Sequence, residues 1–257
     1  MWVCTRVFHV PKRGNAEAEY EDAFYPERNL ARQLGQFRCA VADGASESAF
    51  SGLWAQLLVR SFGKRKMRLE WLRRLFEDVI KSKPVPWYLE KKIKNGAHAA
   101  FLGLLLRDGT HNGNGNGNES GTQAGRAWRA VAVGDSCIFH VRDDELIAVG
   151  PIDKSELFDN SPYLIATKAK DLIRPRSLHH VSMMNGDWEP GDIFYLATDA
   201  IAQWLLAELE AGRPPWESLR DLCADDDTTL YGRLIDELRS NQGLHNDDTT
   251  ILQVEVD

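Results

Sequence analysis

The fold of this chain is most restricted by two apolar segments that lie on either side of a glycine and asparagine repeat. Residues 99–106 read AAFLGLLL, residues 127–133 read AWRAVAV, and the repeat HNGNGNG lies between them. Periodicity alone does not tell whether such short apolar runs are helices or strands. The repeat has no means of burying apolar surface, so it predicts a flexible connection over residues 109–125. Two strands on either side of such a connection form a long antiparallel hairpin.

The other segments read as short strands and amphipathic helices. Strands are predicted where β-branched and aromatic residues gather between turn residues, over residues 2–10, 37–42, 137–142, 146–149, 192–198 and 249–256. Helices are predicted where apolar residues recur at intervals of three and four, over residues 49–62, 69–80, 87–98 and 200–211. Two more helical stretches are predicted after Pro214 and Pro215, and the last carries Leu230, Leu234, Ile235 and Leu238. Ser46 or Ser48 is the predicted N-cap of the first helix. Residues 150–184 show no clear pattern.

Hairpins outnumber strand–helix alternations in this pattern. It therefore favours an α+β fold with layered antiparallel sheets over a doubly wound parallel sheet. Neither a domain linker nor an internal repeat interrupts the pattern, so residues 1–257 are predicted to form a single domain.

Composition and charge exclude several classes of protein. The net charge of −7 argues against a general nucleic-acid partner. No apolar run approaches the ~18–20 residues of a membrane-spanning helix, and the first residues lack the apolar region of a signal peptide. The cysteines are far apart and form no C-x-x-C pair, which disfavours a local zinc site and a disulfide framework: Cys4, Cys39, Cys137 and Cys223. We therefore expect a cytoplasmic protein that uses neither a membrane nor a nucleic acid as its partner.

The charge is unevenly distributed. Between residues 64 and 94 there are eleven lysines and arginines and four acidic residues, an excess of seven positive charges in an otherwise acidic chain. Such a run is usually a solvated helix face. The alternative is a docking surface for an acidic or phosphorylated partner.

Acidic residues stand next to the ends of the predicted strands. Asp43 follows CAVA, Asp135 follows AVAVG, Asp199 follows YLAT, Asp247 precedes the last strand, and the pair Glu21 and Asp22 precedes another short apolar segment. Strand ends at one edge of a sheet converge, so we expect these carboxylates to share one site. Carboxylates within ~4 Å of each other repel by roughly 4 kcal/mol per pair at an effective dielectric of 20, and bound cations relieve that repulsion. Ligand sets made only of oxygen select Mg²⁺ or Mn²⁺ over zinc.

Each aspartate also has a simpler interpretation. A single aspartate after a strand is most often a turn residue or a helix N-cap, and Asp199 stands where a cap of the next helix would lie. The aspartates at residues 225–227 precede a predicted helix, and we interpret them as capping residues. The joint occurrence of the others is what favours a shared site.

Five of these segments together resemble a known family. YEDAF at 20–24, VADGAS at 41–46, AVGDS at 132–136, YLATDA at 195–200 and NDDTTIL at 246–252 occur in that order. They are similar to the E-D, D-G, G-D-S, T-D-G and D-N/D-x-T/S motifs of the type 2C metal-dependent protein phosphatases, the PPM family, in its bacterial form. Each motif alone is weak, but five in order over nearly the whole chain are specific. The resemblance implies a four-layer α-β-β-α sandwich of two antiparallel sheets flanked by helices.

The resemblance also implies a serine/threonine protein phosphatase that binds two divalent cations, Mn²⁺ or Mg²⁺. Asp43 would bridge both ions, and the Gly44 carbonyl and Glu21 would complete the second ion site. Asp199 and Asp247 would hold the first ion. Two cations ~3.5–4 Å apart lower the pKa of a bridging water towards ~7 and neutralise the phosphoryl oxygens during in-line attack. The implied substrate is a phosphorylated protein, and a cognate kinase is an implied partner.

Two further acidic residues receive roles from the resemblance. Asp22 would lie behind the ligands of the first ion. Asp135 looks like the residue that, together with Asp199, holds a weaker third ion in many bacterial members. The residues implied to be catalytic are therefore Asp43, Asp199 and Asp247.

The chain departs from the family pattern at the residues that bind the phosphate and that protonate the leaving group. Many members carry an arginine four residues before the E-D glutamate, and that position is Glu17. Lys12 or Arg13, from the preceding turn, could bind phosphate in its place. Some members have a histidine after D-G as a general acid, whereas this chain has Ala45. Protonation of the leaving group would then fall to a metal-bound water.

Two more departures concern the segment after the T-D motif. Ala200 replaces the usual glycine, which is tolerable if the backbone is helical there, and Gln203 replaces another aspartate. The second change weakens the case for tight binding of a third ion. The sequence thus leaves three hypotheses: an active protein phosphatase, a catalytically impaired phosphatase-like binding module, and a small-molecule phosphohydrolase with a similar binuclear centre.

Overall fold

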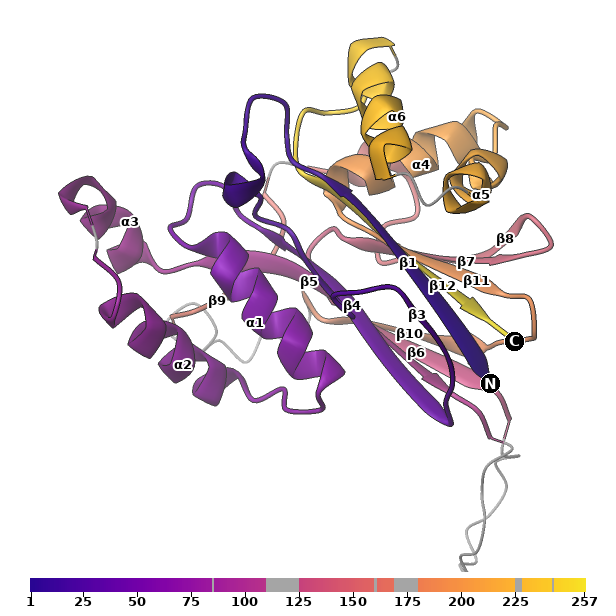
Figure 1. The fold of residues 1–257 in the computed structure, drawn as a ribbon, viewed down its shortest axis with the longest axis horizontal. Helices are drawn as coiled ribbons and strands as arrows, with labels where there is room; N and C mark the ends of the chain where they lie inside the picture. Colours follow the sequence, from indigo (N-terminus) through magenta and orange to yellow (C-terminus); the bar gives the residue numbers. More distant parts are fainter. Residues whose placement is uncertain (85, 110–124, 160, 169–179, 225–227, 242) are drawn as a thin grey trace, which may run out of the picture.

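The computed structural model describes the chain except residues 85, 110–124, 160, 169–179, 225–227 and 242. Two antiparallel sheets lie face to face, and helices cover both outer faces (Figure 1). This confirms the expected four-layer α-β-β-α sandwich. The repeat within the predicted connection over 109–125 and the acidic residues 225–227 lie outside the described residues.

The first sheet, called sheet A here, joins the two ends of the chain. Its strand order is β3-β1-β12-β11-β7-β8. The strands are β1 Trp2–Val10, β3 Leu30–Gln33, β7 Cys137–Arg142, β8 Glu145–Gly150, β11 Ile193–Ala197 and β12 Thr249–Val256. The predicted 137–149 hairpin is confirmed, because β7 and β8 pair and Asp143 and Asp144 turn between them with positive φ angles of 49° and 65°.

The second sheet, called sheet B, contains the hairpin on both sides of the glycine and asparagine repeat. Its order is β10-β6-β5-β4-β2, and β9 also pairs with β5. The strands are β2 Ala23–Tyr25, β4 Gln36–Gly44, β5 His98–Arg107, β6 Ala127–Val133, β9 Ile165–Ala166 and β10 Ser182–Asp187. β5 and β6 pair antiparallel with Leu104 opposite Ala130, so the predicted long hairpin is confirmed.

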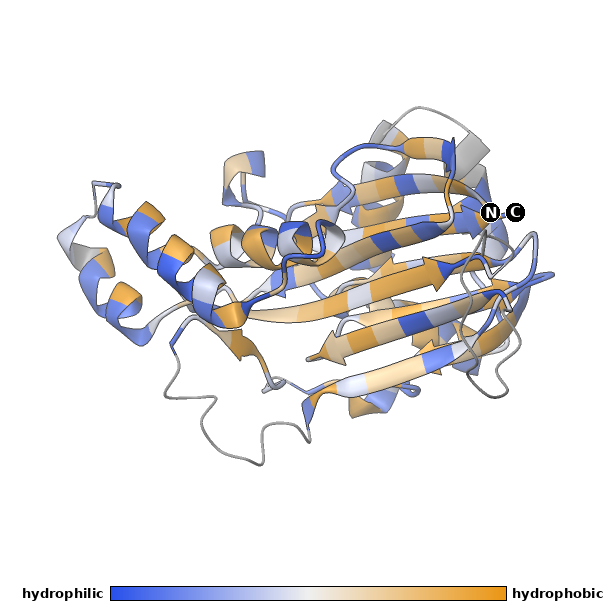
Figure 2. Ribbon diagram, turned by 90° about the horizontal axis from the view of Figure 1, so that it is seen from below, coloured by the Kyte–Doolittle hydropathy of each residue, from blue (hydrophilic) through white to orange (hydrophobic). Residues whose placement is uncertain are grey.

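Alternation along the strands builds three apolar layers. Between the sheets, Val41, Leu104 and Ala130 from sheet B meet Leu196 and Val254 from sheet A. Over part of their length the opposite faces of the same strands pack under helices, and there the central strands are apolar on both sides. Figure 2 shows the strands as largely hydrophobic and the helices as hydrophobic on only part of their surface.

Three of the described helices lie on each outer side of the sandwich. Sheet B carries α1 Ser51–Gly63 and, beyond it, α2 Leu69–Lys81 and α3 Glu90–Asn95, with Trp54 of α1 against Phe76 of α2 at 5.8 Å between ring centroids. Sheet A carries α4 Asp199–Glu210, α5 Trp216–Ala224 and α6 Thr228–Asn241. Short 3₁₀ turns occur at η1 Glu17–Glu19, η2 Trp87–Leu89 and η3 Ser155–Leu157.

Two helix boundaries differ from the sequence-based prediction. The first helix begins at Ser51, after Phe50 in a left-handed conformation, and neither Ser46 nor Ser48 caps it. Ser48 instead donates a hydrogen bond to the Ala45 carbonyl and accepts one from the His98 amide, which ties the loop to β5. The helix predicted over 87–98 ends at Asn95, because Gly96 has a φ of 86° and the following residues enter sheet B.

In the described residues there is no helix that is long and apolar enough to cross a membrane. Residues 150–184, which showed no sequence pattern, contain η3, β9 and the start of β10 among the described positions.

Candidate metal centre

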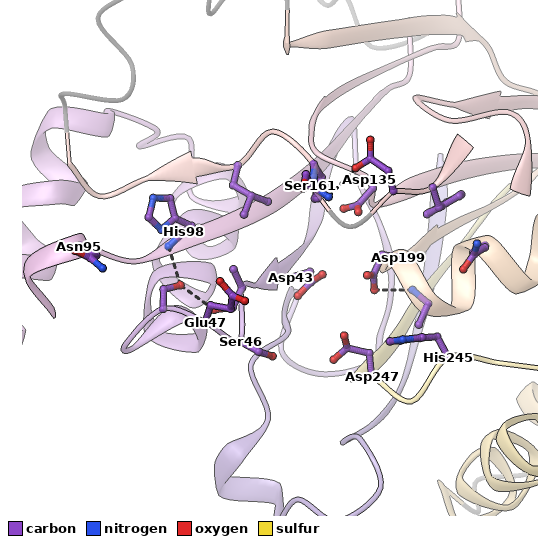
Figure 3. A pocket seen from close by; sticks show the side chains of 18 of the residues that line it. Asp43, Ser46, Glu47, Asn95, His98, Asp135, Ser161, Asp199, His245 and Asp247 are labelled. Carbon is purple, nitrogen blue, oxygen red and sulfur yellow. Dashed lines mark hydrogen bonds between the residues drawn. The ribbon is translucent and has the colours of Figure 1, made fainter. Parts of the chain in front are cut away.

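Four of the predicted site residues line one cavity at one end of the sandwich. Asp43 is the last residue but one of strand β4, and Asp135 follows β6. Asp199 follows β11, and Asp247 precedes β12. The cavity that they share has a volume of about 520 Å³, and Figure 3 shows three of the side chains around one open space with Asp135 nearby. The prediction that they converge at one edge of one sheet was wrong. They come in pairs from two sheets, and the face-to-face packing of the sheets brings the pairs together.

The cavity is acidic to an unusual degree. Its described lining contains six carboxylates and no lysine or arginine: Asp43, Glu47, Asp135, Asp159, Asp199 and Asp247. The basic groups in the lining are two histidines, His98 and His245. A cavity of this composition repels anions and attracts cations.

Burial and mutual repulsion raise the pKa values of these carboxyl groups. Burial first, and then the charges of Asp22, Asp199, Asp135 and Asp247, hold the pKa of Asp43 well above its ordinary value. Burial and repulsion from Asp199 raise the pKa of Asp135 to about 7, and burial and repulsion from Asp247 raise the pKa of Asp199 to about 6. The groups therefore resist being ionised together unless positive charge enters the cavity.

Asp22 lies behind this group rather than in the cavity lining. It is only 6% exposed, and one carboxylate oxygen accepts hydrogen bonds from Thr198 Oγ1 at 2.9 Å and Thr250 Oγ1 at 2.6 Å. The other oxygen, Oδ1, is buried with no hydrogen-bond partner among the described residues. Burial raises the pKa of Asp22 well above its ordinary value, with Asp248 and Asp199 adding to the effect. The threonines tie Asp22 to the start of α4 and to β12.

Gly44 is required by the close approach of its neighbours. A Cβ atom at this position would lie 2.7 Å from the Glu21 carbonyl oxygen and 2.7 Å from the Ser51 carbonyl carbon. These contacts are with backbone atoms, so no side chain could rotate away. The Glu21 backbone is thereby held against the end of β4.

The Glu21 side chain, in contrast, does not line the cavity of the four aspartates. Its Oε1 accepts a hydrogen bond from Ser51 Oγ, and its Oε2 lies 3.8 Å from Lys12 Nζ. It lines a neighbouring cavity together with His9, not the cavity of Asp43. The structure therefore brings together Asp43, Asp135, Asp199 and Asp247 but leaves the Glu21 carboxylate outside the lining of their cavity.

The two basic residues considered for phosphate differ in position. Lys12 Nζ donates a hydrogen bond to Ser46 Oγ at 2.9 Å, and Ser46 lines the acidic cavity, so Lys12 stands at its rim. The Arg13 guanidinium instead faces α6, where it hydrogen-bonds to Ser240 Oγ at 3.1 Å and lies 3.4 Å from Asp236 Oδ1.

Sequence reasoning missed several residues around the site. Asp248, next to Asp247, is 4% exposed and accepts hydrogen bonds from the amides of Lys12 and Glu21 at 2.8 and 2.7 Å. It thus anchors the segment before β2 to the start of β12. The doubled aspartate in NDDTT is the signal that could have indicated this role. Asp159 and Glu47 gave no signal, because one lies in the segment without a pattern and the other in a loop.

The two substitutions after the T-D motif are accommodated. Ala200 lies in the first turn of α4, where the backbone is helical, as the sequence analysis required. Gln203 also lines the cavity, and its Nε2 donates a hydrogen bond to the Ser155 carbonyl at 3.2 Å, which joins α4 to η3.

The chemistry of these residues suits hard divalent cations. Oxygen donors are abundant, and one buried oxygen of Asp22 and one of Asp135 have no partner among the described residues. Burial and then repulsion between the carboxylates raise the pKa values of both groups, and a bound cation would offset both effects. In the part of the chain that the structure describes, however, no group of three or more histidine, cysteine or acidic side chains is already arranged to hold a metal ion. The donors share a cavity, and ion binding would have to draw them closer.

Comparison with known proteins gives the fold. Neither a protein-family model nor a curated protein sequence matches the chain. Solved structures do match. A bacterial serine phosphatase superposes with a TM-score of 0.58 at 10% identity, over 98% of this chain and 97% of that one. The Mycobacterium tuberculosis serine/threonine phosphatase PstP/Ppp gives a TM-score of 0.54 at 14% identity, over the full length of both chains. This chain has the PPM-type phosphatase fold.

The PPM-type fold explains why the five sequence segments lie together. Three of them end or follow the strands β4, β6 and β11, one precedes β12, and one precedes β2. All of these strand ends are at the same end of the sandwich. At 10–14% identity the likeness establishes the fold alone, so the activity has to be argued from the site.

Proposed function

We propose that the chain is a metal-dependent phosphoserine/phosphothreonine protein phosphatase. The observation that carries the proposal is the charge of the cavity, which has six carboxylates and no lysine or arginine in its described lining. A phosphomonoester is an anion, and it is repelled from such a cavity unless cations are bound there. A site that binds cations first and a phosphate second accounts for this composition.

Each of the predicted site residues would have a separate role in binding the cations. Asp43 would contact two divalent cations, Mn²⁺ or Mg²⁺, with Asp199 and Asp247 on one of them and the Gly44 carbonyl and Glu21 on the other. The ions would supply positive charge for the phosphoryl oxygens and a more acidic water as the nucleophile. Glu21 would have to turn from Ser51 towards the cavity. Asp135 and Asp199 would hold a weaker third ion, and Asp22 would orient the start of α4 through Thr198.

Lys12 is the better candidate for the phosphate contact. Its ammonium group is already at the cavity rim on Ser46, whereas the Arg13 guanidinium is engaged with α6. A single ammonium group binds phosphate as a point charge, without the bidentate geometry of arginine.

The proposed substrate is a phosphorylated protein, with a cognate kinase as the opposing activity. The acidic net charge speaks against a nucleic-acid partner. A reducing, cytoplasmic location belongs to the proposal, and it is supported by the free thiols of Cys4, Cys39 and Cys137.

One observation favours a second candidate function, a catalytically impaired phosphatase-like binding module. The Glu21 carboxylate faces Ser51 and Lys12, so one of the implied ligands of the second ion is engaged elsewhere. A protein that keeps Glu21 in this place would bind fewer ions and would not hydrolyse phosphoesters.

Hydrolysis assays separate the two functions. The full chain is assayed on p-nitrophenyl phosphate and on phosphoserine and phosphothreonine peptides, with Mn²⁺, with Mg²⁺ and with EDTA. We expect cation-dependent turnover that Asp43→Asn abolishes and that the exposed α2 substitution Asp78→Asn leaves unchanged. Turnover of the small ester but of no peptide would favour a small-molecule phosphohydrolase, and cation binding without turnover of any substrate would favour the binding module.

A further inference from the structure

The outer face of sheet B is covered by α1 over only part of its length. α1 runs from Ser51, near the acidic cavity, and Gly63 at its end lies over Tyr25 (Figure 1). Phe62, in the last turn, sits on Gly103 in the middle of β5. Beyond this point β4, β5, β6 and β10 continue, and in the described part of the chain no helix of sheet B lies above their outward side chains.

Strand register gathers arginines on this uncovered part. Arg38 of β4, Leu105 of β5, Arg129 of β6 and Asn185 of β10 are opposite one another and form one row across the sheet. The next row towards the sheet end contains Gln36, Arg107, Ala127 and Asp187. Alternation places both rows on the outer face, because the residues between them, such as Phe37 and Leu106, lie in the core between the sheets.

The loop after α1 adds a fourth guanidinium group. Arg65 donates a hydrogen bond to Gln36 Oε1 and so stands over the second row. Arg38, Arg65, Arg107 and Arg129 are called the arginine face below. Consecutive members of the set are at least 22 positions apart in sequence, and the first and the last are 91 positions apart. The fold brings them together.

The arginine face is short of negative charge. None of the ion pairs among the described residues includes any of its four members. Asp187 is the one acidic residue in the two rows, and it lies on the edge strand. Arg38 is held over the Phe62 ring at 5.2 Å, and its buried Nε has no hydrogen-bond partner among the described residues. Burial, and then the charges of Arg65 and Arg107, lower the pKa of Arg38, so the positive charges are close enough to repel one another.

These charges do not serve the acidic cavity. Asp43 is five residues from Arg38 along β4, which is about 17 Å at roughly 3.4 Å per residue. At that separation salt screens most of the interaction between exposed charges. Within the two rows the positive charges face one acidic residue, Asp187, so an excess of positive charge is left, which is the expected condition of a surface that meets an external anion.

We propose that the arginine face is a docking surface for an extended, acidic segment of a protein partner. Arg38 and Arg129 are two strands apart, roughly 10 Å, and the two rows are roughly 7 Å apart along the strands. Alternate side chains of an extended peptide are also roughly 7 Å apart, so acidic residues at every second position match the spacing. Met183 is opposite Val131 on the same face and is 79% exposed, which adds an apolar contact beside the charges.

The spacing of the four arginines and the exposed methionine beside them favour an acidic peptide over a free anion as the bound partner. One phosphate group is held by guanidinium groups that converge within about 3 Å of its oxygens, whereas these four guanidinium groups come from three separate strands and a loop. An exposed methionine contributes to contact with a peptide side chain and nothing to contact with an inorganic ion.

Peptide binding to the full chain tests the proposal without any need for catalysis. The probe is a dye-labelled peptide of about eight residues in which glutamate alternates with serine and one leucine, long enough to cross both rows at roughly 3.3 Å per residue. Its partner probe has glutamine in place of glutamate. Fluorescence anisotropy gives Kd for the wild type, for Arg107→Gln/Arg129→Gln, and for the control Arg32→Gln/Arg233→Gln, which removes the same charge from exposed positions on β3 and α6.

We expect the Arg107→Gln/Arg129→Gln variant to bind the glutamate peptide roughly fivefold to thirtyfold more weakly than wild type. The control should change Kd less than twofold, and the glutamine peptide should bind to none of the proteins. Because both arginines are exposed, the melting temperature of the variant should not fall, and removal of repelling charges should keep it at or above that of wild type. Turnover of p-nitrophenyl phosphate should be unchanged in both variants, so a failure of the proposed phosphatase activity would leave the binding result intact.

Equal weakening in the variant and the control would mean that the peptide senses only net charge, and the proposal would be wrong. It would also be wrong if millimolar inorganic phosphate displaced the peptide completely, which would indicate a free-anion site. Binding to phosphatidylserine vesicles through Arg107 and Arg129, without binding of the peptide, would assign the surface to a membrane instead.

Discussion

Repulsion within the acidic cavity predicts that neutralising one carboxylate stabilises the protein when metal is absent. Burial and the charge of Asp247 raise the pKa of Asp199 from 3.8 to about 6. A difference of about two pH units, at 1.36 kcal/mol each, costs the folded state roughly 3 kcal/mol relative to the unfolded chain when Asp199 is ionised. Asp199→Asn removes that cost, and its side-chain oxygen can still accept the Ala200 amide hydrogen bond that Asp199 accepts at 2.5 Å.

The pH dependence follows from the sign of the shift. A carboxyl group whose folded pKa is raised contributes stability that is present below its unfolded pKa and lost as pH rises through the folded pKa. The penalty for Asp199 thus starts near pH 4, grows to its full size just above pH 6, and stays constant at pH 8. At pH 5 it has reached about half of that size.

Thermal unfolding in EDTA measures this effect. Each kcal/mol moves the melting temperature of a protein of this size by roughly 2–4 °C, so Asp199→Asn should raise it by roughly 6–12 °C at pH 8 and by about half as much at pH 5. Asp78→Asn, an exposed substitution on α2, is the matched control and should change it little at either pH. A melting temperature that falls in Asp199→Asn at pH 8, or that rises equally in the control, would refute the idea that the cavity is held under repulsion.

Three further outcomes are expected. Mn²⁺ at about 100 times its Kd should add about 2.7 kcal/mol and raise the wild-type melting temperature by about 5–11 °C, an effect that EDTA reverses and that grows between pH 6 and 8 as the carboxyl groups lose their protons. Gly44→Ala places a Cβ 2.7 Å from the Glu21 carbonyl oxygen, so its urea midpoint should correspond to a loss of about 1–3 kcal/mol; an unchanged midpoint would mean that the loop gives way freely. Lys12→Met should raise KM for a phosphopeptide while Arg13→Met should not, and equal KM values for both would exclude Lys12 as the phosphate contact.

Local patterns in the sequence were sufficient for most of the secondary structure. The first and last strands were predicted with the bounds that the structure shows, 2–10 and 249–256, because alternating side chains report which face of a strand is buried. Phe50, in a left-handed conformation, shows the limit of this reasoning. The first helix begins at the next residue, Ser51, and Ser48 is bonded to Ala45 and to His98 of β5 instead of capping it; a contact 50 residues away leaves no mark on the local pattern.

The site was predictable in its members more than in its geometry. Asp43, Asp135, Asp199 and Asp247 could be selected because each stands at a strand end, but the sequence did not reveal that they come from two stacked sheets. The Glu21 side chain contacts Ser51, which is 30 positions away, and Lys12, and neither residue belongs to the E-D motif, so the motif could not give its position.

Charge patterns along the sequence indicated a basic stretch over residues 64–94, interpreted as a solvated helix face or as a docking surface. In the structure Arg65 lies over Gln36 at the sheet end far from the cavity, whereas Asn95, just after the stretch, lines the cavity. The arginine face, by contrast, combines residues from four separate segments, because register across a sheet joins positions that the sequence keeps apart.

Direct titration of Mn²⁺ into the metal-free full chain tests the central claim that the acidic cavity binds divalent cations. Calorimetry at pH 8 should show two ions bound to the wild type, with a weaker third that Asp135→Asn removes. Asp43→Asn, which takes away the carboxylate proposed to contact both ions, should abolish the two stronger binding events, while Asp78→Asn should leave them unchanged. Absence of Mn²⁺ binding by the folded wild-type protein, or equal binding by Asp43→Asn, would contradict the account.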